Sequence, residues 1–176
     1  MSPRRHVATC VLAAVALAVG SCASDSRDEA DVALERTVRE YFLGMAAERP
    51  DENRAAMARI VPTADDFAAL LPASAESLWA VWGPEAARLV AEAPARAQEY
   101  REALPIVAVR TSDLRRDAPL VLARSLAFLP PELPVRGVVI ELRKGERVAS
   151  AFVPVRGRWI WIWDLERLGS IASAPR

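Results

Sequence analysis

The sequence predicts an α+β domain in which N-terminal helices pack on a curved antiparallel sheet of about five strands. Up to Leu104, apolar residues recur every three or four positions, which is the period of an amphipathic helix. After Leu104, short β-branched runs alternate with turn residues, as in a series of hairpins. The chain has 176 residues, a length that normally forms one domain. We therefore expect a single domain over residues 27–168 and a C-terminal tail over residues 169–176.

The first helix is expected to start near Arg27 and to run for about five turns. Ser26-Arg27-Asp28-Glu29 has the pattern of a capping box, and Arg49-Pro50 stops the run. Between these signals, five large side chains repeat at helical spacing: Leu34, Val38, Tyr41, Phe42 and Met45.

Shorter helices are predicted between Pro50 and Leu104. Thr63 is a good N-cap, Gly83 is expected to close one helix, and Pro84 suits the first position of the next. Pro94 inside that last helix predicts a kink or a break. The expected ranges are 51–60, 64–71, 76–82 and 84–104.

Five strands are predicted after Leu104, with tight turns at Lys144-Gly145 and Arg156-Gly157. Pro154 indicates an edge or a bulge in the fourth strand, because proline cannot donate a ladder hydrogen bond. In the last strand, tryptophans alternate with isoleucines, which predicts a covered, central strand with two apolar faces. The expected strands cover residues 106–110, 120–128, 135–143, 148–155 and 158–164.

The N-terminal segment has the features of an export signal. Arg4 and Arg5 precede an uncharged run over residues 7–19, which is too short to span a bilayer. The run ends in Val19-Gly20-Ser21-Cys22, which resembles the lipobox of bacterial lipoproteins. The resemblance implies a signal peptide over residues 1–21, lipidation of Cys22 and a lipidated tether over residues 22–26. The protein would then be anchored in the cell envelope, on the periplasmic face of the outer membrane if the cell has one, otherwise outside the cytoplasmic membrane. The alternative is an ordinary secretory peptide with a chance cysteine.

Removal of residues 1–21 would leave few reactive side chains. His6 and Cys10 would be lost, so the mature chain would have no histidine and no cysteine besides Cys22. Zinc sites, Ser-His and Cys-His catalytic pairs and internal disulfides would then be excluded. The glycines form no phosphate-binding motif. We expect no metal, no cofactor and no catalytic residue, and hence not an enzyme.

Charge is divided along the chain. The 23 basic and 23 acidic residues balance, which argues against a nucleic-acid partner. Residues 22–104 carry an excess of acids and residues 105–176 an excess of bases. The favoured interpretation is a basic sheet that attracts acidic helices within one domain. The alternative is that the nine arginines between Arg110 and Arg158 form an exposed face for anionic lipid or a partner.

The order of elements resembles the NTF2-like superfamily, a cone-shaped α+β fold. The resemblance rests on a long first helix with Tyr41-Phe42, shorter helices, and a meander ending in Arg156-Gly157-Arg158-Trp159. It implies a fold shared by isomerases, dehydratases, lipid carriers and non-catalytic adaptors. Four aromatic residues are candidates to line a pocket or an interface: Trp159, Trp161, Trp163 and Tyr41.

Two functions compete. The favoured one is a non-catalytic lipoprotein module that binds an envelope protein or an apolar ligand, with a homodimer through the sheet as one possibility. The alternative is a small isomerase or dehydratase that uses a buried carboxylate of raised pKa. Its first candidates are Asp65, Asp113 and Tyr41. The interior of the cone separates the two, because a carboxylate beside a tyrosine would favour the enzyme.

Overall fold

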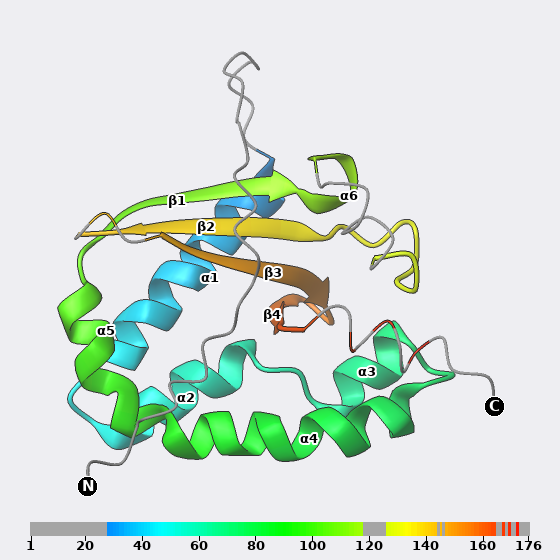
Figure 1. Ribbon diagram of the computed structural model, residues 1–176, viewed down its shortest axis with the longest axis horizontal. Coiled ribbons are helices and arrows are strands. Elements are labelled where there is room, and N and C mark those ends of the chain that lie inside the picture. Colours follow the sequence, from blue (N-terminus) through cyan, green and yellow to red (C-terminus); the bar gives the residue numbers. More distant parts are fainter. Residues whose placement is uncertain are drawn as a thin grey trace, which may run out of the picture.

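The computed structural model describes residues 28–117, 126–143, 145, 147–164, 167, 169 and 172. Within them the chain forms an α+β domain with one four-stranded antiparallel sheet in the order β1-β2-β3-β4 (Figure 1). The α+β class is therefore confirmed. The elements are α1 (Glu29–Ala46), α2 (Pro50–Ile60), α3 (Ala64–Leu70), α4 (Ala75–Glu92), the 3-10 helix η1 (Ala93–Arg96), α5 (Ala97–Ala103), β1 (Ile106–Asp113), α6 (Leu114–Asp117), β2 (Arg136–Leu142), β3 (Arg147–Val155) and β4 (Arg158–Ile162).

Helix α1 follows the predicted apolar spacing, and its buried stripe includes Leu34, Val38 and Phe42. Its N-cap is Asp28, whose side chain accepts a hydrogen bond from the backbone N–H of Ala30. The predicted cap at Ser26 lies outside the described residues.

The C-terminus of α1 is capped by a side chain from α2. Asn53 is 1% exposed, and its Nδ2 lies 3.0 Å from each of the carbonyl oxygens of Gly44, Met45 and Ala47. The last carbonyls of a helix have no partner within it, so a buried amide that donates to them closes the helix end. This contact fixes α2 against α1.

Helix α4 differs from the prediction, because Gly83 does not end a helix and Pro84 does not begin one. The helix continues through both residues, with Pro84 inside it. Pro84 and Ala80, whose carbonyl would have accepted the missing hydrogen bond, both lie on the exposed side of the helix, so the free carbonyl does not have to be buried. Gly83 is buried beneath the indole of Trp79, and a Cβ there would lie 2.8 Å from that ring. The break predicted at Pro94 is confirmed by η1.

The sheet is a simple meander joined by tight turns. Arg156 and Gly157 between β3 and β4 have φ of 50° and 79°, the signs that a type I′ hairpin turn requires. Pro154 pairs with Trp159 of β4, but β2 reaches only as far as Arg136, which lies opposite Phe152. The predicted local edge at Pro154 is therefore confirmed.

Two predictions about the sheet are not confirmed. Most of the expected strand over residues 120–128 lies outside the described residues, and residues 126–128 form turns. The described part of the chain therefore has a sheet of four strands, where about five were predicted. The last strand, β4, is an edge strand and not central. Helix α2 is in contact with β4, so side chains that an uncovered edge strand would expose to solvent can be apolar.

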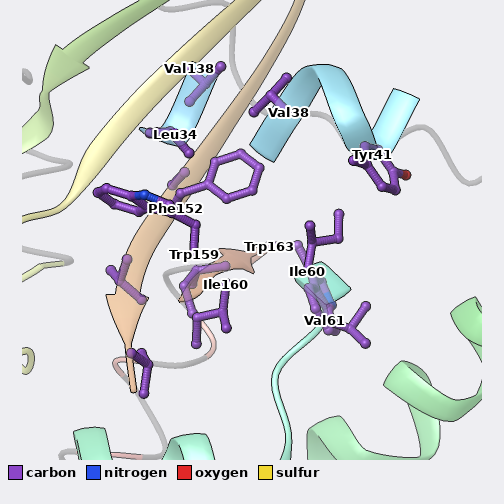
Figure 2. Close-up of a cluster of buried hydrophobic side chains, with 14 of the residues drawn as sticks. Leu34, Val38, Tyr41, Ile60, Val61, Val138, Phe152, Trp159, Ile160 and Trp163 are labelled. Carbon is purple, nitrogen blue, oxygen red and sulfur yellow. The ribbon is translucent and has the colours of Figure 1, made fainter. Parts of the chain in front are cut away.

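The core fills the space between the sheet and the helices. Figure 2 shows side chains of α1, of the end of α2 and of β2, β3 and β4 that belong to one cluster of buried residues. In β4, Trp159 and Ile160 are both buried although successive strand residues point to opposite faces. The members drawn from these elements include Leu34, Val38, Ile60, Val61, Val138, Phe152, Trp159 and Ile160.

Candidate functional site

The three predicted tryptophans gather at the last strand, where alternation places them on one face. Trp159 and Trp163 are buried in the core, and Trp161 is partly buried against it. The ring centroids of Trp161 and Trp163 lie 5.2 Å apart at an interplanar angle of 47°. These side chains therefore act first as packing groups.

The indole nitrogens of Trp161 and Trp163 are unusual. Both Nε1 atoms are buried, and neither has a hydrogen-bond partner in the described part of the chain. A buried donor without an acceptor costs about 1–3 kcal/mol, and buried indole N–H groups usually find a partner. The described residues therefore leave two buried donors on neighbouring rings without an acceptor.

Tyr41 belongs to a different cluster, at the contact of α1 with α5. Its hydroxyl oxygen lies 2.5 Å from that of Tyr100, and the rings of Tyr41, Phe42 and Tyr100 meet edge to face. The guanidinium of Arg96 lies 5.9 Å from the centroid of the Tyr100 ring. Burial raises the pKa of Tyr41 well above its ordinary value, and the neighbouring Tyr100 raises it further. Tyr41 therefore stays protonated at neutral pH.

The four predicted pocket residues are thus not all brought together, because Tyr41 lies apart from the tryptophans. Figure 2 places Tyr41 well apart from Trp159 and Trp163, on the far side of the drawn interior. The partner that Tyr41 does have, Tyr100, comes from a helix 59 residues further along the chain. Spacing in the sequence gave no signal for that pairing.

The predicted acids have structural partners. The side chain of Asp65 is 76% exposed and pairs with Arg156 at 2.8 Å. Asp113 accepts from Arg136 at 3.0 Å and from the backbone N–H of Arg115 at 2.9 Å, which caps α6. Neither is the buried carboxylate beside a tyrosine that the enzyme alternative named.

The buried carboxylate is the neighbouring residue, Asp66, at 2% exposure. It accepts from the backbone N–H of Thr63 at 2.7 Å and from its hydroxyl at 2.8 Å, and it forms an ion pair with Arg158. Arg158 also donates to the carbonyls of Arg59 and Val61 at the end of α2. One guanidinium on β4 therefore holds the end of α2 to the start of α3.

A second arginine, Arg136 on β2, binds three carboxylates. Its guanidinium nitrogens lie 3.1 Å from Asp28, 2.9 Å from Asp31 and 3.0 Å from Asp113. The side chain of Arg136 is only 13% exposed. Together with the pairs of Arg156 and Arg158, this cluster confirms the predicted attraction between a basic sheet and acidic helices.

The alternative of one exposed arginine face stays a prediction. Arg136 and Arg158 are engaged by carboxylates and largely buried, and Arg115 donates to the carbonyls of Leu129, Pro130 and Leu133. The side chains of Arg110, Arg116 and Arg156 are 65%, 78% and 57% exposed. Arg124 lies outside the described residues.

Over the described ranges, no group of three or more His, Cys, Asp or Glu side chains is arranged to hold a metal ion. No helix among them has both the length and the apolar character needed to cross a membrane. No protein-family model, curated protein or solved structure matches the chain.

Proposed function

We propose that the chain is a lipid-anchored protein of the bacterial cell envelope whose NTF2-like domain is a non-catalytic module that binds a partner protein. The anchor is the lipid on Cys22. The observation that carries the proposal is the extended hydrophobic cluster, in which Phe152, Trp159 and Ile160 of the sheet are buried together with side chains of α1 and α2. A domain whose interior is occupied by its own side chains offers its surface for recognition.

The state of the acidic residues also favours a binding module over an isomerase or dehydratase. A general base must be within reach of its substrate and free to accept a proton. Asp66 is buried but engaged by Thr63 and Arg158, and Asp113 is engaged by Arg136. The hydroxyl of Tyr41 forms its hydrogen bond with the hydroxyl of Tyr100 and not with a carboxylate.

A second candidate is the binding of an amphipathic ligand, and one observation favours it. The Nε1 atoms of Trp161 and Trp163 are buried donors without a partner among the described residues. An ester or carboxylate oxygen would satisfy them while an attached apolar chain lies on the rings.

Native mass spectrometry of protein extracted from its own membrane separates these functions. The partner proposal expects a stoichiometric complex, with an envelope protein or with a second copy bound through the sheet, and an intact mass that includes lipid on Cys22. A monomer that carries a small amphipathic molecule would favour the second candidate. A monomer with nothing bound, or an unmodified Cys22, would contradict the proposal.

The Cys22→Ser variant is the matched control. It is expected to lose membrane attachment and to keep the same complex, because the domain and not the anchor makes the contact. Loss of the complex in this variant would show that membrane confinement, rather than a specific surface, holds the partner.

A further inference from the structure

We infer that the lipid anchor presents one corner of the domain to the lipid headgroups and directs the opposite end, along α1, away from them. This inference rests on the proposed lipidation of Cys22. The corner is formed by the start of α1, the end of β1 and helix α6, which lie side by side (Figure 1). We call it the anchor corner, and its charged residues are Asp28, Glu29, Asp31, Asp113, Arg115, Arg116, Asp117 and Arg136.

The position of Asp28 determines which corner this is. Asp28 is the first described residue and caps α1, and five residues, 23–27, separate it from Cys22. An extended chain spans at most about 3.6 Å per residue, so Asp28 lies within roughly 20 Å of the lipidated cysteine. Every residue bound to Asp28 is held near the membrane with it.

Arg136 fixes the point at which the tether leaves the domain. It bonds to Asp28 at the cap and to Asp31 in the first turn of α1, and the same guanidinium bonds to Asp113 of β1. Because the side chain of Arg136 is largely buried, these bonds are less weakened by solvent than an exposed pair would be. The first turn of α1 is thereby attached to two strands and does not lengthen the tether by fraying.

The charges of the anchor corner indicate how it meets the membrane. Arg136 is shared among three carboxylates, and Arg116 pairs with Asp117 at 2.8 Å. With five carboxylates and three guanidiniums, the corner is not a basic patch that would attract anionic lipid. The tether and not charge attraction therefore brings this corner to the headgroups.

The opposite end lies along the axis of α1. This helix has 18 residues, which corresponds to a length of about 27 Å. Beyond it lies the exposed Glu48, between α1 and α2, and α5 packs beside the end of α1. These elements form the surface that a partner coming from the aqueous compartment meets first.

The test uses the absence of competing thiols in the lipidated chain, since its only cysteine carries lipid once residues 1–21 are removed. Single cysteines are introduced as Arg116→Cys in the anchor corner, where the side chain is 78% exposed, and as Glu48→Cys at the opposite end. Each lipidated protein is labelled with a donor dye and reconstituted in phosphatidylcholine vesicles with acceptor dye on a small fraction of the headgroups. Energy transfer is expected to be higher from position 116 than from position 48. It is expected to stay unchanged when anionic phosphatidylglycerol is added.

Equal or reversed transfer from the two positions, with lipid present on Cys22 by mass, would overturn this inference and leave the proposed function standing. Absence of lipid on Cys22 would overturn both. Arg136→Met, combined with Arg116→Cys, is expected to lower the transfer because the first turn of α1 is released. Arg156→Met, which breaks an exposed pair with Asp65 outside the corner, is expected to leave it unchanged. Circular dichroism is used to check that each variant is folded. Identical transfer in the two folded variants would also contradict the role of Arg136.

Discussion

Replacement of Arg158 by Ala tests whether the junction of α2, α3 and β4 depends on one ion pair. The change leaves the carboxylate of Asp66 buried at 2% exposure with only the two donors of Thr63. It also removes the donors to the carbonyls of Arg59 and Val61. Leaving one partner of a buried pair uncompensated costs about 3–5 kcal/mol. Because the side chain of Arg158 is 31% exposed, we expect the low end, about 3 kcal/mol.

The same hairpin turn supplies a matched control. Arg156, two residues earlier, pairs with Asp65, the neighbour of Asp66, but both of these side chains are mainly exposed. Exposed pairs contribute about 0–1 kcal/mol, so Arg156→Ala should lower the free energy of unfolding by less than about 1 kcal/mol. Urea unfolding of both variants, followed by circular dichroism and tryptophan fluorescence, gives the comparison.

Equal losses of stability for Arg158→Ala and Arg156→Ala would refute the reasoning, since burial would then make no difference. If Arg158→Ala does not fold, the double variant with Asp66→Asn decides the matter. Removal of the unpaired negative charge of Asp66 should restore part of the lost stability. A double variant no more stable than Arg158→Ala would show that the buried carboxylate of Asp66 was not the source of the penalty.

Three further predictions concern the hairpin turn, the buried tyrosine and the tryptophans. Gly157→Ala should lower the free energy of unfolding in urea by about 1 kcal/mol, because a φ of 79° is strained for alanine. No atom lies within 4 Å of the added Cβ, so the loss would come from the backbone alone. An unchanged midpoint would contradict the type I′ turn. The raised pKa of Tyr41 means that, as pH rises through about 10, the unfolded chain loses this proton first, so stability falls. Tyr41→Phe should weaken this alkaline loss, measured by thermal unfolding from about pH 9 to about pH 12, and an identical pH profile would argue against a buried Tyr41. Trp163→Phe should destabilise less than Trp159→Phe, because only the first removes a buried donor that has no acceptor among the described residues; equal losses would contradict this expectation.

Local signals were sufficient for most elements. Thr63 forms the predicted N-cap, with a capping box completed by Asp66, and Pro94 interrupts the helices where predicted. At Pro84 the local signal was wrong, since a proline whose missing bond lies on the solvent side is tolerated in a helix that tertiary packing stabilises. The edge position of β4 could not be deduced either, because a covering helix and a central location produce the same apolar pattern.

The candidate site was less predictable than the fold. The composition indicated that acids and arginines would pair across the domain, but not which ones. Asp65 and Asp66 are adjacent in the sequence, and only the helical turn of α3 exposes one and buries the other. The indole nitrogens of Trp161 and Trp163, which have no partner within the described ranges, also depend on the three-dimensional arrangement, since alternation predicts which face a side chain takes but not whether its N–H meets an acceptor.

The order in which the chain is synthesised gives the two arginine clusters a further consequence. The Asn53 cap of α1 joins residues six to nine positions apart, so it can form as soon as α2 is made. The bonds of Arg158 to Asp66 and of Arg136 to Asp31 and Asp28 span 92, 105 and 108 residues. Contacts of such long separation form slowly, because a long loop must be closed first. The ion pairs that attach the helical half of the protein to the sheet can therefore form only after β2 and β4 have been synthesised.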